Sequence, residues 1–185
     1  MSTRFATVAG ALLLPLAGCA EVRAPEPVPE RPPEVLADNF RNFEARLLDA
    51  HNRVRAAAGM PPLAWDAGLA ADAARYGPQL AALDKLVHAP AAERRGAGET
   101  LWMGTSGRFS LENMVADWAS EQRYFRPGTF PDVSSTGKWA DVAHYTQIIW
   151  RNTQRVGCAF HPTPKWDYLI CRYSPAGNVI GQRVP

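Results

Sequence analysis

The sequence predicts an α+β fold in which helices cover a mixed β-sheet. Apolar residues recur at helical spacing along residues 36–83, whereas residues 156–160 and 168–173 alternate as strands do. No repeating βαβ rhythm links these segments, which favours the α+β class. Hydrophobic residues make up 46% of the 185 residues and charged residues 21%, enough for one domain with a real core. The net charge of +2, without a basic run interleaved with aromatics, predicts no nucleic-acid partner.

Residues 1–18 have the pattern of a secretory signal. Arg4 is the only charged residue before Glu21, and residues 5–16 are almost wholly apolar. This apolar stretch is too short to remain as a transmembrane helix, which needs about 20 residues. We therefore expect export of the protein and removal of residues 1–18.

The segment ends in the motif LAGC at residues 16–19, which resembles the lipobox of bacterial lipoproteins. In such proteins the cysteine is acylated and becomes the new N-terminus, so the resemblance implies a lipid anchor on Cys19. Ala20 stands where an inner-membrane retention signal has aspartate, and this favours the outer membrane. An ordinary signal peptide with a chance cysteine is the alternative.

Residues 19–35 are expected to tether the lipid to the folded domain. The stretch AEVRAPEPVPERPPEV, from 20 to 35, alternates prolines with charges. Proline lacks the amide donor and fixes φ, so neither a helix interior nor a core strand fits here. An extended, polyproline-like chain is expected, and the folded domain is assigned to residues 36–185.

Two helices are expected at the start of the domain. The first runs from near Leu36 to about Ala58, where a Gly-Met-Pro-Pro sequence stops it. The second covers residues 64–83, with an apolar stripe on one face and a kink expected at Gly77-Pro78. Residues 84–98, rich in alanine, glycine and arginine, are expected to form a loop.

Shorter elements follow. A strand is expected over residues 99–103, and Ser110 is a candidate N-cap for a helix that runs to about Phe125. After a turn-rich loop, Asp141 is a candidate cap for a helix that ends at Trp150, ahead of the two C-terminal strands.

Cys158 and Cys171 are the cysteines that remain after Cys19, and they fall in the two predicted C-terminal strands. A hairpin with its turn centred on residues 164–165 places them opposite each other. In an oxidising compartment such a pair forms a disulfide, worth about 3 kcal/mol on the chain-entropy model. A metal-binding pair is the alternative, but no CxxC spacing supports it.

Seven short blocks of sequence carry a family resemblance. They are LDAHNRVR (48–55), PLAWD (62–66), GETLW (98–102), WASE (118–121), HYTQIIW (144–150), VGCA (156–159) and CRYSPAGN (171–178). In this order, over residues 40–183, they resemble the CAP superfamily, which includes cysteine-rich secretory proteins, insect antigen 5 and the plant class-one pathogenesis-related proteins. The chain is similar to the simpler bacterial branch, because the extra disulfides of many eukaryotic members are missing.

The resemblance implies a three-layer α-β-α sandwich with a mixed central sheet. It also implies a cleft lined by His88, Glu99, Glu121 and His144, in which a divalent metal, often zinc, binds through the two histidines. The chain departs from the family pattern at Thr100, where asparagine is common, and after His88, where serine is common.

The chemistry of these residue types fits such a cleft. Neutral imidazole is a good zinc ligand, and a nearby carboxylate can orient the ring or accept a proton from metal-bound water. Glu99 and Glu121 are therefore the candidate catalytic bases, and His88 and His144 the candidate metal ligands. Two protein ligands are fewer than the three of most catalytic zinc sites. The alternative is a buried polar network that shapes the cleft without chemistry.

Other histidines and tryptophans are expected to be structural. His51 is expected to be a core histidine with its hydrogen bonds satisfied, and His161 a solvated loop residue. Trp139 and Trp166 fall in predicted loops, where they are candidates to contact a ligand. The remaining tryptophans that we expect in the core are Trp65, Trp102, Trp118 and Trp150.

Three functions fit the sequence, because a fold alone does not fix one. The first is an envelope-tethered module that binds a lipid or a cell-wall component. The second is a metal-assisted hydrolase, acting on peptides or wall polymers, with Glu99 or Glu121 as base. No HExxH or GxSxG motif supports hydrolysis. The third is a passive structural or host-interaction protein.

Overall fold

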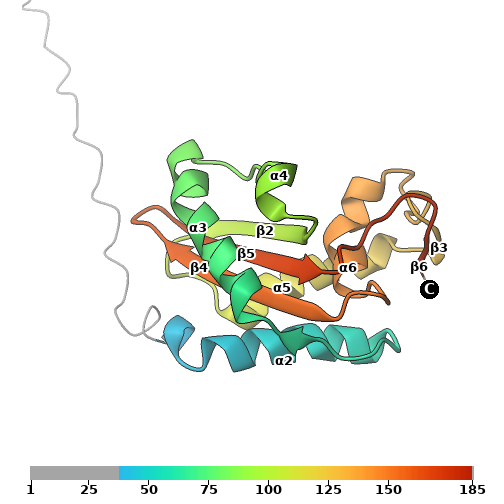
Figure 1. Ribbon diagram of the computed structural model, residues 1–185, viewed down its shortest axis with the longest axis horizontal. Coiled ribbons are helices and arrows are strands. Elements are labelled where there is room, and N and C mark those ends of the chain that lie inside the picture. The colour runs from blue at the N-terminus through green and yellow to red at the C-terminus, as the bar shows by residue number, and fades with distance from the viewer. Residues whose placement is uncertain (1–37, 185) are drawn as a thin grey trace, which may run out of the picture.

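The computed structural model describes residues 38–184 (Figure 1). The expected signal segment 1–18, the expected lipid site Cys19 and the tether that follows it lie outside the described residues. Among the residues that are described, no helix combines the length and the hydropathy needed to cross a bilayer.

A mixed sheet of four strands forms the middle layer. Its order is β1 (Ala64–Trp65), β4 (Arg155–Pro162), β5 (Trp166–Ser174) and β2 (Gly98–Thr105). β1 runs parallel to β4, and the other neighbours are antiparallel. A second, two-stranded sheet pairs β3 (Gly128–Thr129) with β6 (Arg183–Val184).

Both faces of the four-stranded sheet are covered by helices, as the predicted three-layer α-β-α sandwich requires. In Figure 1, α3 (Ala67–Leu83) crosses in front of the strands, and α5 (Leu111–Ala119) lies behind them. Leu169 and Cys171 of β5 join the core with α5 and α2 (Phe43–Ala57), whereas Tyr168 and Ile170 join the core with α3. This alternation with a period of two is what a strand buried on both faces must show.

The first two helices start later than predicted. The chain turns at Asn42, whose φ of 50° breaks the helix expected from residue 36, because asparagine tolerates the left-handed region. The second helix begins after Asp66, whose carboxylate accepts a hydrogen bond from the Leu69 amide at 3.0 Å. The preceding β1 pairs with β4, so it is not available to the helix. Pro78 lies inside α3 without ending it.

The middle elements match the prediction in part. Ser110 caps α5 by accepting from the Asn113 amide, as predicted, and the 3-10 helix η1 (Ser120–Tyr124) continues it. The short helix α4 (Ala91–Arg94) lies in the expected loop.

The prediction that Asp141 caps the next helix is wrong. A 3-10 turn, η2 (Trp139–Val142), precedes α6 (Ala143–Ile148), and the Asp141 carboxylate accepts from the Thr136 hydroxyl instead. A carboxylate from another element takes over the capping role, as described below.

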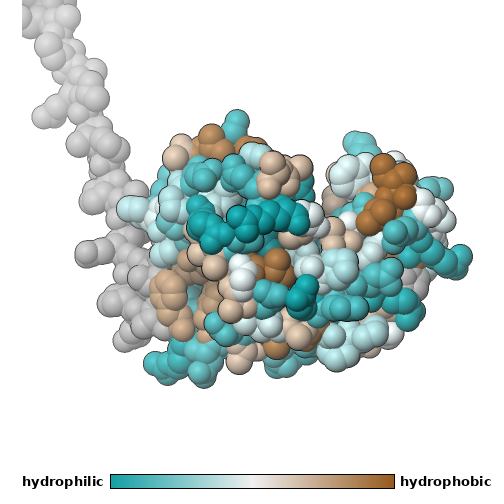
Figure 2. Space-filling view, viewed as in Figure 1, coloured by the Kyte–Doolittle hydropathy of each residue, from teal (hydrophilic) through white to brown (hydrophobic). Residues whose placement is uncertain are grey.

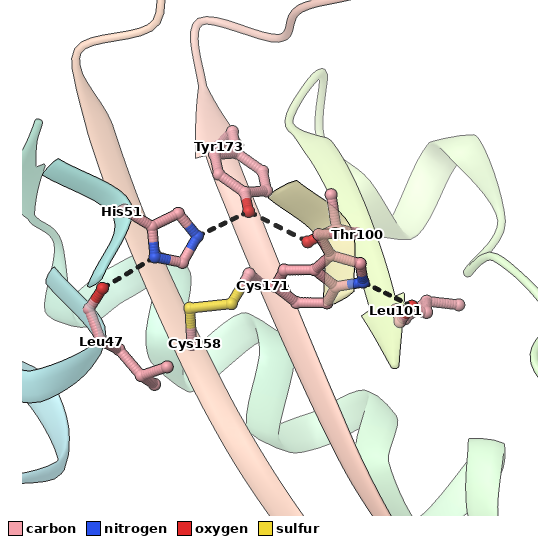
Figure 3. The surroundings of a disulfide bond; sticks show 8 residues. Leu47, His51, Thr100, Leu101, Cys158, Cys171 and Tyr173 are labelled. Carbon is pink, nitrogen blue, oxygen red and sulfur yellow. Dashed lines mark hydrogen bonds between the residues drawn. A yellow bond between two sulfur atoms is a disulfide. The ribbon is translucent and has the colours of Figure 1, made fainter. Parts of the chain in front are cut away.

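The predicted disulfide is present. Cys158 and Cys171 are directly opposite in the β4–β5 pairing, with Cα atoms 4.1 Å apart, and they form a buried disulfide (Figure 3). The spacing fits a non-hydrogen-bonded antiparallel pair, in which side chains lie closest.

His51 is a core histidine, as predicted, and it lies beside the disulfide (Figure 3). Its Nδ1 donates to the Leu47 carbonyl at 2.8 Å, since a carbonyl only accepts. Burial lowers the pKa of His51 to about 4, so Nε2 carries no proton and accepts from the Tyr173 hydroxyl at 2.9 Å. The Tyr173 oxygen must then accept from the Thr100 hydroxyl at 3.0 Å. Thr100, where the sequence departs from the family pattern, thereby completes this buried series of hydrogen bonds.

Arg55 fastens α2 to the end of α6. It is fully buried, and its guanidinium donates to four backbone carbonyls, those of Pro61, Ile148, Trp150 and Thr153, at 2.6–3.1 Å. Burial without an acidic partner lowers the pKa of Arg55 to about 10. The position of α6, and with it the site described next, depends on this contact.

Candidate functional site: a cleft with two histidine–glutamate pairs

A half-open hollow of about 290 Å³ lies between the start of β2, α6 and the loop after β5. Figure 2 shows the surface indented between the part of the molecule that carries α4 and the part that carries α6. The walls of the hollow include three of the four predicted site residues, namely His88, Glu99 and His144. The fourth, Glu121, is hydrogen-bonded to His144. The structure therefore brings all four together.

The first pair joins His88 to Glu99. The ring nitrogen Nδ1 of His88 donates to Glu99 Oε1 at 2.6 Å, and the Ala89 amide donates to the same oxygen at 3.0 Å. Glu99 is the second residue of β2 and lies opposite Arg172 on β5, and its Oε2 is 3.0 Å from Arg172 Nη2. Both side chains of this ion pair are buried, so the Glu99 charge is compensated within the protein.

The second pair joins His144 to Glu121. His144 Nδ1 donates to Glu121 Oε1 at 2.6 Å. Glu121 Oε2 accepts from the backbone amides of His144 and Tyr145, at 2.9 and 3.1 Å. These are the second and third amides of α6, which has no side-chain cap of its own. Glu121 thus caps α6 from η1, and its charge faces the positive end of the helix.

Stacking fixes the His144 ring further. The indole of Trp118 lies 6.0 Å from it, at an interplanar angle of 16°. Trp118 and Glu121 are three residues apart, a spacing that places two side chains on the same face of a helix. The ring of His144 is therefore held by a carboxylate at one edge and an aromatic plane at one face.

Both histidines suit a metal. A carboxylate that accepts from Nδ1–H leaves the lone pair on Nε2 and fixes the orientation of the ring, the usual arrangement of a metal-binding histidine. The two histidines line one hollow, and two protein ligands leave coordination positions for water or a ligand. The donor set therefore fits a divalent metal held through two protein ligands.

A second cluster of metal-ligand types does not fit a metal. His51, Cys158 and Cys171 place their donor atoms within 4.8 Å of one another, the one such group of three or more in residues 38–184. The two sulfurs are joined in the disulfide, and both His51 nitrogens have hydrogen-bond partners. Neither a thiolate nor a free imidazole nitrogen remains to bind an ion.

Sequence reasoning missed several cleft residues. Arg94, on the unpredicted α4, lines the hollow, as does Asn178. Asn178 has φ 56° and ties the last loop to α6, because it accepts from the Thr146 hydroxyl and donates to the Ala143 carbonyl. The block ending in Gly-Asn was a signal for this loop, but nothing in it marked which element the asparagine binds.

The tryptophans and His161 match the predicted positions only in part. Trp139 lines the cleft and is 48% exposed, whereas Trp166 starts β5 and is half-buried away from the hollow. His161 is not in a loop but on β4, where it packs against Gly77 of α3; a Cβ at Gly77 would lie 2.9 Å from its Cγ. Trp65 is half-buried, and the core tryptophans are Trp102, Trp118 and Trp150.

The fold and the cleft together define a small α-β-α sandwich module with glutamate-paired histidines. The sequence model of the CAP family, described as the cysteine-rich secretory protein family, matches residues 48–173, and the chain belongs to this family.

Similar proteins and a solved structure support this family assignment and the fold. Pathogenesis-related protein 1B of Nicotiana tabacum is 39% identical over 147 residues, covering 79% of this chain and 83% of the relative. Secreted protein RBT4 of Candida albicans is 33% identical over 143 residues, covering 75% of this chain and 36% of that protein. The crystal structure of NaASP2 with Zn2+ matches with a TM-score of 0.66 at 21% identity, covering 90% of this chain and 88% of that one. This structural likeness shows the shared fold.

Proposed function

We propose that the domain is an envelope-tethered ligand-binding module whose cleft holds a divalent metal through Nε2 of His88 and of His144. Zinc is the metal that suits these imidazole ligands best. One observation carries this proposal. Each histidine donates from Nδ1 to a glutamate at 2.6 Å, which leaves the other nitrogen available. The solved structure of NaASP2 with Zn2+ supports the choice of metal. When bound, the ion would offer open coordination positions to an electron-pair donor of a ligand.

Binding is favoured over catalysis by the partners of the two carboxylates. Glu99 is engaged by His88, the Ala89 amide and Arg172, and Glu121 by His144 and the α6 amides. A general base must have an oxygen within reach of the proton it takes. Metal-assisted hydrolysis of peptide or wall polymer, with Glu99 or Glu121 as base, stays as the second candidate and requires one carboxylate to leave its partners. A passive structural or host-interaction role predicts neither binding nor turnover.

Export and anchoring are part of the proposal. The disulfide suits an oxidising compartment outside the cytoplasm, and one relative is named a secreted protein. The LAGC motif supports a lipid on Cys19 and attachment to a membrane, with the outer membrane favoured. Labelling cells with a radioactive fatty acid tests this. Label on the wild type and none on Cys19→Ser is expected; label on both, or on neither, overturns the anchor.

The metal is tested by calorimetric titration of zinc into residues 20–185, which are the mature chain without the acylated Cys19. One-to-one binding with a Kd on the order of micromolar, near −8 kcal/mol, is expected. His88→Ala and His144→Ala should each abolish it. His161→Gln is the control, because this histidine lies on β4 outside the cleft lining. Absence of binding, or binding that survives both cleft substitutions, contradicts the proposal.

A further inference from the structure

Two cleft residues that neither hold the metal nor pair with a glutamate indicate the chemistry of the ligand. Trp139 begins η2, and Arg94 ends α4, and both line the same hollow as the histidines. They come from segments 45 positions apart in the sequence, and neither belongs to the buried core.

Trp139 offers a flat apolar face. It is 48% exposed, and its contact with Phe130 is edge-on, with ring centroids 5.6 Å apart at 62°. An indole exposed in a cleft presents a broad plane to a ligand at little entropic cost. The C–H face of a sugar ring, or another ring of similar width, packs well on such a plane.

Arg94 offers a positive charge. Its Nε donates to the Ala89 carbonyl at 3.0 Å, and within residues 38–184 its two terminal nitrogens have no hydrogen-bond partner. The acid on the same wall, Glu99, is already compensated by Arg172. The guanidinium fork matches a carboxylate, and charge-assisted pairs of this kind are about twice as strong as neutral hydrogen bonds.

The size of the hollow suits a single ring better than a long lipid chain. About 290 Å³ is the lower end for ligand pockets, enough for one ring with its substituents. Burial of an acyl chain is driven by apolar contact, about 0.8 kcal/mol per methylene. The lining combines apolar residues, such as Trp139 and Ala143, with polar and charged ones, such as Arg94, Gln147 and Asn178.

We propose that the cleft binds a saccharide unit that bears a carboxylate, with the ring on Trp139 and the carboxylate on Arg94. This deepens the proposed ligand-binding function and rests on it, but the two contacts do not pass through the metal. Of the two ligand classes that the sequence leaves open, the wall-type saccharide is selected over the lipid.

Glucuronate and glucose form a matched pair of probes, because they differ only by a carboxylate in place of a hydroxymethyl group. Binding to the mature chain is measured by calorimetry or ligand-observed NMR, with and without zinc. Glucuronate should bind at least about tenfold more tightly than glucose, and salt should reduce the difference. Equal affinities, or no binding of glucuronate, overturn the proposal.

Variants locate the contacts. Arg94→Gln should abolish the preference for glucuronate, and Arg94→Lys should keep part of it because the charge remains. Arg95→Gln is the control, since Arg95 is the exposed neighbour outside the hollow and should retain the full preference. Trp139→Ala should weaken both sugars alike. A preference that survives Arg94→Gln refutes the assignment.

The same variants separate this proposal from the metal. Zinc titration of Arg94→Gln should match the wild type, whereas His144→Ala should lose zinc. Loss of zinc binding in the histidine variants with no sugar preference in the wild type overturns the saccharide alone. A sugar preference without zinc binding overturns the metal alone. Thermal unfolding confirms that each variant is folded before its binding is compared.

Discussion

Glu121 is expected both to cap α6 and to orient the ring of His144, and two different substitutions separate these roles. The carboxylate accepts from two α6 amides through Oε2 and from His144 Nδ1 through Oε1. Glu121→Ala removes a helix cap, a loss of about 1–2 kcal/mol, and a hydrogen bond to an ionised group that contributes about another 1 kcal/mol or more. Together the free energy of unfolding should fall by about 2–3 kcal/mol. For a domain of this length that is a decrease in Tm of about 5–10 °C.

Glu121→Gln is the more informative change, because it keeps the shape. One amide oxygen remains to accept from the α6 amides, and the NH2 group then faces His144 Nδ1. A ring nitrogen opposite a donor must accept, so the proton moves to Nε2 of His144. The cleft nitrogen thereby loses its lone pair, and zinc affinity should fall by at least about tenfold while Tm changes by only a few degrees.

The assays are thermal unfolding and zinc calorimetry on the same preparations. Glu93→Ala is the control, because Glu93 is an exposed acid on α4 outside the cleft, and a change within about 0.5 kcal/mol is expected. If Glu121→Ala has the same Tm as the wild type, the cap contributes nothing to the free energy of unfolding and the proposed capping role is wrong. The proposed orienting role is wrong if Glu121→Gln binds zinc as well as the wild type.

Three further outcomes are expected. Arg55→Lys should lower the free energy of unfolding by about 2–4 kcal/mol in urea titration, because one ammonium cannot reach four separate carbonyls; an unchanged midpoint would contradict the role of Arg55. The double variant Cys158→Ala, Cys171→Ala should have a free energy of unfolding about 3 kcal/mol lower, because the disulfide closes a short loop. It should keep zinc binding, because neither cysteine lines the cleft. His51 has a folded pKa of about 4, below its ordinary 6.5, so the unfolded chain takes up the proton first. Stability should therefore decline from pH 6.5 to pH 4 by about 3 kcal/mol, and His51→Gln should flatten that part of the pH profile.

The longer strands of the sheet, β2, β4 and β5, and the helices that cover them were predictable from the sequence. Residues 156–160 and 168–173 alternate as strands do, and a hairpin centred on residues 164–165 predicts the β4–β5 register, with Cys158 opposite Cys171. The Ser110 cap was predictable from local sequence alone, because the cap and the amide it serves are three residues apart.

Contacts between distant segments were not predictable from local sequence. Asp141 stood at the right place for a cap, yet α6 is capped by Glu121, more than 20 residues earlier in the chain. Similarly, β1 looked like the start of a helix, because its two residues, Ala64 and Trp65, carry no strand pattern of their own. Pairing with a neighbour decides such cases, and local propensity is too weak to oppose it.

The histidines show what separates structure from function in this chain. His51, His88 and His144 each donate from Nδ1, so the count of hydrogen bonds at that atom does not distinguish them. The acceptor does: a backbone carbonyl holds His51, whereas carboxylates hold the two cleft rings. The second nitrogen completes the distinction. Nε2 of His51 accepts from the Tyr173 hydroxyl, whereas the glutamates bind only Nδ1 of His88 and His144, whose rings line the hollow. A histidine oriented by a carboxylate, with its other nitrogen free, is prepared for a ligand, and a histidine with both nitrogens satisfied is prepared only to hold the core together.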